Sequence, residues 1–174
     1  MSEALRRQAL AIYQEGLAAI TPEVLMQRAL HLEGDALTLT FLDRTERVTL
    51  APGESVSVVA IGKAAAPMAA ELHRLMGPRI RQGLIVTKEG FSLPGLPWPV
   101  HETGHPIPDE LGAKAADAVA ALVSTFSADE TLLVLMSGGA SALLPAPLEG
   151  ITLAEKQALV DRMLRTNMDI HEVN

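Results

Sequence analysis

The stretch VSVVAIGK, residues 56–63, decides the fold of this chain. Its nearly continuous run of β-branched and aliphatic residues is typical of a strand that is covered on both faces. A Gly-Lys turn closes the strand, and residues 64–76 then carry apolar side chains at helical spacing. The Gly-Pro pair at 77–78 ends this helix, because proline does not continue one. The segment therefore predicts a strand–turn–helix unit.

Further strands of the same kind follow along the chain. Residues 83–87 and 131–136 are short apolar runs that predict buried strands, and residues 98–102 predict a short third strand or extended segment. An alanine-rich helix is expected over residues 109–125. Strands that alternate with helices predict an α/β fold with a mostly parallel sheet and helices on both sides of it.

The N-terminal part of the chain follows other patterns. Residues 3–20 place apolar side chains on one face of a helix. Thr21 then caps a second helix, which has proline at its first position and ends near Leu30. Alternating residues on both sides of a polar turn predict a hairpin near residues 36–50, at the edge of a larger sheet.

The C-terminal part contains one complete helix and the beginning of another. Thr152 is expected to cap the complete helix, and its inner face should carry four residues: Leu153, Ala158, Leu159 and Met163. Residues 169–174 have the pattern of a helix start that stops after one turn. Because so short a helix is not stable alone, we expect that the natural chain continues.

Composition narrows the class of protein. The chain has 174 residues, the length of one domain, and its 14 Lys and Arg against 21 Asp and Glu give a net charge of -7. Without a basic stripe it is not expected to bind nucleic acid. The absence of Cys excludes disulfides and thiolate metal sites, and fits a reducing cytoplasm. No apolar run approaches the ~20 residues of a membrane span, so we expect a soluble, cytoplasmic protein without a membrane partner.

The first candidate site is the turn after residues 56–61, where Lys63 stands at the start of a helix. A lysine is unfavourable there because the helix dipole is also positive at this end. A bound phosphate or carboxylate would turn that conflict into an anion site. The alternative is a solvated lysine on an ordinary strand–helix turn.

The second candidate is the loop SGGAS at residues 137–141. Two glycines between hydroxyl residues, directly after a buried strand, can form a backbone nest for phosphates. The loop lacks the Gly-Lys-Ser/Thr ending of a Walker A motif and the Gly-x-Gly-x-x-Gly dinucleotide fingerprint. Ser141 is not surrounded by a Gly-x-Ser-x-Gly elbow, which argues against a nucleophile. A plain tight turn is the alternative.

A third segment, residues 102–110, is rigid and polar. His101 and His105 are four residues apart, but the intervening Gly104 and the following Pro106 do not allow the helix that would bring them together. We therefore predict no metal site here. His105 either contacts a substrate or makes a structural hydrogen bond.

Taken together, three motifs resemble the glycerate 2-kinase family, which includes proteins named hydroxypyruvate reductases. They are GKAAAPMA from residue 62, GHPIPD from residue 104 and SGGASAL from residue 137, and their order and spacing match along most of the chain. The resemblance implies an ATP- and Mg²⁺-dependent kinase that phosphorylates D-glycerate at its 2-hydroxyl. It also implies a Rossmann-like three-layer αβα domain, a second α/β domain, and an active site in the cleft between them.

The resemblance also implies roles for single residues. Lys63 matches a lysine that is catalytic or contacts phosphate, and the nucleotide phosphates would lie on Ser137, Gly138, Gly139, Ala140 and Ser141. Ala140 departs from the pattern, because that loop usually has another glycine there; if the position needs a positive φ, the methyl group tightens the turn. Substrate contacts fall on His105 and on Asn174, which matches the first residue of the family's Asn-Thr-Val-Arg-Lys stretch.

Residues 1–174 are accordingly expected to be the N-terminal domain of a longer two-domain kinase, without the C-terminal domain. Such a chain would supply one wall of the cleft and would be weakly active or inactive alone, because phosphoryl transfer needs several cations around the transferred group. An NAD(P)-dependent hydroxypyruvate reductase and a non-catalytic anion-binding module are the alternatives. The residues are also compatible with a homodimer.

Overall fold

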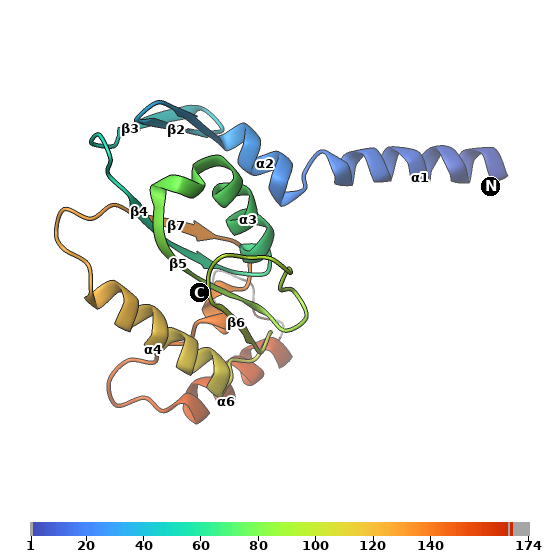
Figure 1. The fold of residues 1–174 in the computed structure, drawn as a ribbon. Coiled ribbons are helices and arrows are strands. Elements are labelled where there is room, and N and C mark those ends of the chain that lie inside the picture. The colour runs from blue at the N-terminus through green and yellow to red at the C-terminus, as the bar shows by residue number, and fades with distance from the viewer. Residues whose placement is uncertain (1, 167, 169–174) are drawn as a thin grey trace.

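The core of the fold is a four-stranded parallel sheet, seen in a computed structural model that describes residues 2–166 and 168 (Figure 1). Its strands are β4 (Val56–Ile61), β5 (Ile80–Lys88), β6 (Val100–Thr103) and β7 (Leu132–Met136), in the order β6-β5-β4-β7. All neighbouring pairs are parallel. The parallel sheet expected from the sequence is confirmed.

Helices cover both faces of this sheet, as the three-layer prediction required. On one face, α3 (Ala65–Met76) buries Leu72 and Met76 against a cluster that includes Ile85 of β5. On the other face, α4 (Glu110–Ser124) and the short α5 (Ala140–Leu143) pack on a second cluster, through Ala115 and Leu143. The central strand β4 is buried at every residue, which explains its continuous apolar run.

The hairpin expected near residues 36–50 is present as β2 (Ala36–Phe41) and β3 (Arg44–Thr49). It does not extend the parallel sheet. Instead it forms a separate antiparallel sheet with β1 (Leu30–Glu33), a strand that the sequence analysis missed. The helix α2 (Pro22–Ala29), capped by Thr21, leads directly into β1 and packs on α3.

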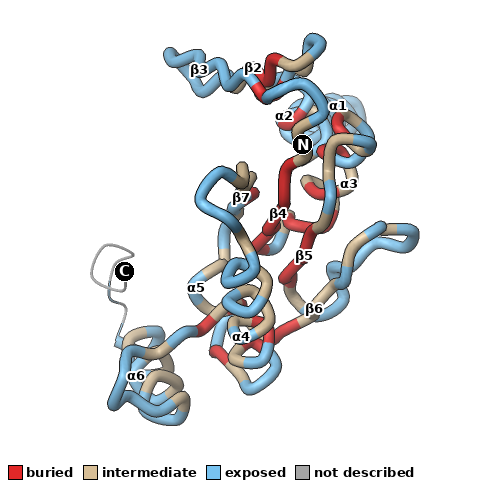
Figure 2. The backbone as a smooth tube through the Cα atoms, turned by 60° about the vertical axis from the view of Figure 1, so that its left-hand side comes forward, coloured by how far each residue is buried: buried red, intermediate tan, exposed pale blue. Residues whose placement is uncertain are grey.

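The two terminal helices lie at the periphery. The helix α1 (Glu3–Ala18) projects away from the rest of the chain (Figure 1) and buries none of its residues. The helix α6 (Leu153–Arg165) has the expected Thr152 cap, with a capping box to Glu155, but also buries no residue (Figure 2). The expected inner face of α6 is therefore wrong for the described chain: Leu159 is 57% exposed.

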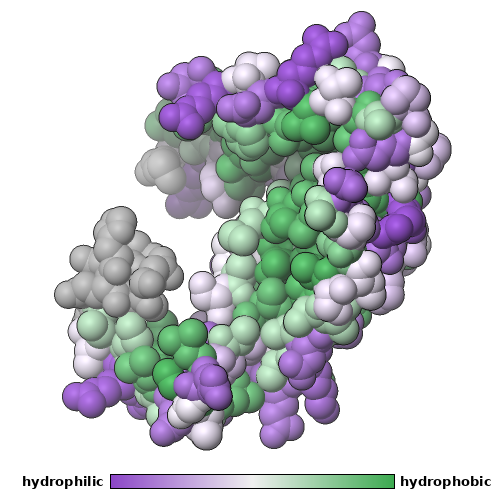
Figure 3. Space-filling view, turned by 90° about the vertical axis from the view of Figure 1, so that its left-hand side faces the viewer, coloured by the Kyte–Doolittle hydropathy of each residue, from purple (hydrophilic) through white to green (hydrophobic). Residues whose placement is uncertain are grey.

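The strand β7 differs from the fully buried strand expected over residues 131–136. Leu133 and Leu135 pack with the cluster on the α3 side, whereas Val134 and Met136 are 50% and 65% exposed. The difference arises because β7 is an edge strand and α4 lies over the opposite edge, against β6. A space-filling view shows apolar side chains gathered in a hollow on this side of the molecule (Figure 3).

Among the helices that the structure describes, none combines the length and the apolar character needed to cross a membrane.

Candidate functional site

The three sequence motifs meet at one end of the parallel sheet. Lys63 follows β4, His105 follows β6, and the Ser137–Gly139 loop follows β7. Because the strands are parallel, their carboxyl ends lie at the same edge, which is where ligands bind in open α/β sheets. The fold therefore brings together segments that are up to 76 residues apart in sequence.

The turn after β4 is locked onto the turn after β7. The backbone N–H of Ser137 donates to the carbonyl of Ile61 at 2.9 Å, and that of Lys63 donates to the carbonyl of Gly138 at 3.0 Å. The Ser137 hydroxyl accepts a hydrogen bond from the N–H of Ala64 at 3.0 Å. Gly62 has φ +125, and a Cβ built on it would lie 2.1 Å from Ser137 Oγ. This position therefore requires glycine.

His105 and Lys63 both approach Gly139 on the side where a side chain would stand. A Cβ on Gly139 would lie 3.0 Å from His105 Cδ2 and 3.4 Å from Lys63 Cγ, so both side chains approach the loop backbone closely. Gly139 itself has φ +97, a conformation that glycine adopts freely. The Lys63 side chain is exposed and His105 is half-buried. A small anion above this glycine could therefore contact both residues.

The segment around His105 is held by hydrogen bonds on both sides. The Asp109 carboxylate accepts from the N–H of Gly104 at 2.9 Å and from the N–H of Gly112 at 2.8 Å. It caps α4 in this way, so the helix begins one residue later than the expected residue 109. The buried Thr103 hydroxyl donates to the carbonyl of Leu143 at 2.9 Å, which ties β6 to α5. These bonds fix the backbone that carries His105 beside the loop.

The electrostatics of the site favour a neutral histidine. Burial lowers the pKa of His105 below its ordinary value, and the positive charges of Lys63 and Lys88 lower the pKa further. Near neutral pH the imidazole is therefore uncharged and can accept a hydrogen bond. An anion bound beside the two lysines would raise this pKa.

Other predicted site residues have different surroundings. Ala140 is the first residue of α5, and Leu42 alone among the described residues other than glycine has a positive φ. The alanine therefore fits the loop without strain. Ser141 lies on the same short helix and is exposed. Asn174, also assigned a substrate contact, lies outside the described residues.

Lys88 is a charged residue near His105 that the sequence motifs did not single out. It is the last residue of β5, the strand between β4 and β6. No motif marks it, because Thr-Lys-Glu at the end of a strand is an ordinary sequence. The register pairs Val86 of β5 with Ile61 of β4. Lys88 follows Val86 by two residues, as Lys63 follows Ile61. This equivalence of the two lysines becomes visible only once the register is known.

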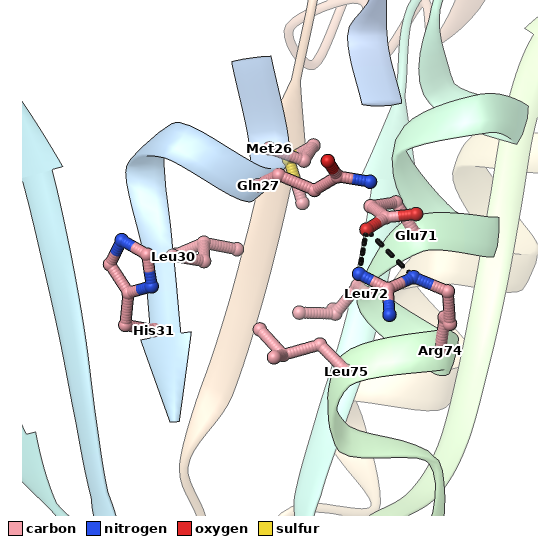
Figure 4. A pocket seen from close by; sticks show the side chains of 8 residues that line it. All are labelled: Met26, Gln27, Leu30, His31, Glu71, Leu72, Arg74 and Leu75. Atoms are coloured by element: carbon pink, nitrogen blue, oxygen red, sulfur yellow. Dashed lines mark hydrogen bonds and ion pairs between the residues drawn. The ribbon is translucent and has the colours of Figure 1, made fainter. Parts of the chain in front are cut away.

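A pocket of about 390 Å³ lies elsewhere, between α2 and α3. Glu71 and Arg74 of α3 form an ion pair at its wall, at 2.5 Å, and Gln27 of α2 faces the same carboxylate (Figure 4). Hydrogen bonding from Arg74 lowers the pKa of Glu71. Because Glu71 is already paired, we interpret this cavity as part of the packing between the two helices.

Metal-ligating side chains do not cluster in the part of the chain that is described. Within residues 2–166 and 168, no group of three or more His, Asp or Glu side chains is placed to hold a metal ion. The groups that the strand ends do bring near one another are the ammonium groups of Lys63 and Lys88, the His105 imidazole and the glycine loop.

Comparison with known proteins gives a consistent result. Residues 8–174 match the family model described as a domain of unknown function, DUF4147. The D-glycerate 2-kinase of Thermotoga maritima is 38% identical over 156 residues, which cover 88% of this chain and 37% of the relative. A protein of Agrobacterium vitis named for hydroxypyruvate reductase is 35% identical over 67% of this chain and 30% of its own length.

A solved structure shares the fold. The crystal structure of a glycerate kinase from Thermotoga maritima has a TM-score of 0.74 and 32% sequence identity, and the match covers 99% of this chain and 37% of that one. The chain thus spans little more than a third of the length of such relatives.

Proposed function

The chain belongs to the DUF4147 family and is related to the N-terminal part of glycerate kinases, and on this premise we propose that it supplies one wall of the active site of a D-glycerate 2-kinase. The proposed reaction transfers the γ-phosphoryl group of ATP to the 2-hydroxyl of D-glycerate and yields 2-phosphoglycerate and ADP. The observation that carries the proposal is the close approach of the Lys63 and His105 side chains to Gly139 at the strand ends.

Each residue has a role that suits its surroundings. The Lys63 ammonium would stabilise the negative charge of the transferred phosphoryl group, which is the main task of a protein in this chemistry. The backbone of Gly138 and Gly139, with Ser141, would border the ATP phosphates. Neutral His105 would accept a hydrogen bond from a glycerate hydroxyl.

Mg²⁺ would arrive with ATP, since this ion is commonly held by one or two carboxylates together with substrate phosphates. The described residues offer no complete metal site, so we assign no step of the reaction to the metal. The chain alone would be weakly active or inactive, because one lysine and one glycine loop surround the phosphoryl group on one side only.

The name hydroxypyruvate reductase, carried by a relative, would require a dinucleotide. The turn after β4 reads GKAAAP rather than Gly-x-Gly-x-x-Gly, so it lacks the second glycine that lets the backbone approach a pyrophosphate. This residue pattern favours the kinase over a reductase.

The test compares the purified chain with a chimera in which it is joined to the part of the Thermotoga maritima D-glycerate 2-kinase that it does not span. We expect little turnover from the chain alone and phosphorylation at the 2-hydroxyl by the chimera, identified by phosphorus NMR. Lys63→Met in the chimera should lower kcat by about 10²- to 10³-fold, while the matched variant Lys114→Met, at an exposed site on α4, should leave it unchanged. A folded chimera that does not phosphorylate glycerate, or that reduces hydroxypyruvate with NADH, would contradict the proposal.

A further inference from the structure

Lys88 occupies the same position on β5 that Lys63 occupies after β4. The register pairs Ile61 of β4 with Val86 of β5, and each lysine stands two residues beyond its member of this pair. On the other side of β5, Lys88 pairs with Thr103 of β6, and His105 follows Thr103 by two residues. The two lysines and His105 therefore end three neighbouring strands.

The side chain of Lys88 belongs to the face of the sheet that carries the glycine loop. Alternate residues of a strand share a face, so Lys88 shares the face of Val86, which packs in the cluster with Leu143 of α5. Thr103, the partner of Lys88, donates to the carbonyl of Leu143 on the same side. The loop that leads into α5 thus lies on the face to which Lys88 contributes its ammonium group.

The backbone around Lys88 is fixed by the next strand. The N–H of Glu89 donates to the carbonyl of Thr103 at 3.1 Å. One oxygen of the Glu102 carboxylate accepts from the N–H groups of Gly90 and Ser92 at 3.1 and 3.0 Å. The Glu102 carboxylate therefore accepts hydrogen bonds that hold the turn after β5. The Lys88 Nζ lies 5.0 Å from the centre of the Phe91 ring, a contact that leaves the ammonium free to bind an anion.

Within the described part of the chain, the charges of the two lysines are not balanced by an ion pair. The ion pairs among residues 2–166 and 168 involve arginines, and neither Lys63 nor Lys88 takes part in one. The Asp109 carboxylate, near His105 in sequence, is occupied by the N–H groups of Gly104 and Gly112. Two ammonium groups at adjacent strand ends repel each other, and an oxyanion between them removes that cost.

We propose that Lys88 is a second anion-binding residue of this site, and that it acts with Lys63 to hold a compact oxyanion of the substrates above Gly139. The oxyanion is either a phosphate group of ATP or the carboxylate of glycerate. Its identity rests on the proposed kinase function, whereas the binding of an oxyanion by the two lysines does not.

The first experiment measures anion binding by the purified chain at low ionic strength, with inorganic phosphate and D-glycerate as separate probes in calorimetric titrations. Lys88→Gln should weaken binding of one or both probes by about 10- to 100-fold, the usual effect of losing one charge-assisted hydrogen bond. Lys88→Arg should keep most of the affinity, and the matched control Lys114→Gln should keep all of it. Loss with phosphate assigns Lys88 to ATP, and loss with D-glycerate assigns it to the carboxylate.

A second readout tests the placement of Lys88 independently of affinity. The pKa of His105, followed by proton NMR of its imidazole, should rise in Lys88→Gln because one nearby positive charge is removed. It should stay unchanged in Lys114→Gln. Added phosphate should raise it in the wild-type chain and raise it less in Lys88→Gln.

The inference would be overturned if Lys88→Gln bound both probes as tightly as the wild-type chain, or if the wild-type chain bound neither. Failure of the kinase proposal would look different, as a folded chimera that binds these anions in a Lys88-dependent way without transferring phosphate.

Discussion

The strand-end loops and the helix α1 respond differently to the same small change, the addition of one methyl group. At Gly62 a Cβ would lie 2.1 Å from Ser137 Oγ, whereas at Gly16 of α1 it would meet nothing within 4 Å. Both regions have clear sequence patterns, yet the first carries the candidate site and the second buries none of its residues. The candidate site thus lies where two turns of the backbone are packed closely together, whereas α1 stands apart from the rest of the described chain.

The largest expected effect comes from Gly62→Ala. The substitution combines a φ of +125 with the contact to Ser137, so it should lower the free energy of unfolding by about 3 kcal/mol or more. Gly16→Ala is the matched control and should raise it by about 0.5–1 kcal/mol, because alanine is the better helix former. Urea denaturation of both variants measures the difference. If the two variants had similar free energies of unfolding, the close packing of the turn after β4 against Ser137 would be contradicted.

A smaller effect is expected from Ser137→Ala. Its hydroxyl accepts from the N–H of Ala64 at the start of α3, so its removal should cost about 1 kcal/mol of unfolding free energy. Ser141→Ala, at an exposed position of the adjoining helix α5, should change it by less than about 0.5 kcal/mol. Thermal or urea unfolding of the pair provides the measurement. If Ser137→Ala weakened phosphate binding and left stability unchanged, the hydroxyl would serve the ligand rather than the helix.

The parallel sheet could be predicted from the sequence because the spacing of apolar residues differs between its strands and the helices that follow them. The continuous run at residues 56–61 indicated a strand buried on both faces, and β4 is such a strand. Thr21 and Thr152 each cap the helix that follows them, as expected, whereas Asp109, expected inside the first turn of its helix, is the residue that caps it. These are local interactions, which the sequence alone can specify.

Features that depend on distant contacts could not be predicted in this way. The apolar residues of β1 directly follow those of α2, so the sequence shows no boundary between the two elements. Residues 30–33 form a strand because they pair with β2. Apolar spacing at Leu159 suggested an inner face for α6, yet no residue of that helix is buried in the described chain. Periodicity indicates which side of an element is apolar, and packing decides whether that side is covered.

The candidate site shows the same division. The motifs at Lys63, His105 and residues 137–141 are visible in the sequence because each has unusual composition for a loop. Lys88 was missed because its importance comes from the register between β4, β5 and β6. The predicted ligand roles of these residues stay predictions until anion binding is measured.

The most direct measurement is a phosphate titration of the isotopically labelled chain, followed by its amide resonances in two-dimensional NMR. We expect the largest shifts at Lys63, Lys88, Gly138 and Gly139, since an oxyanion held at the strand ends would lie among them. Shifts confined to the α2–α3 pocket, at Met26 and Glu71, or no saturable shifts at all, would contradict the account.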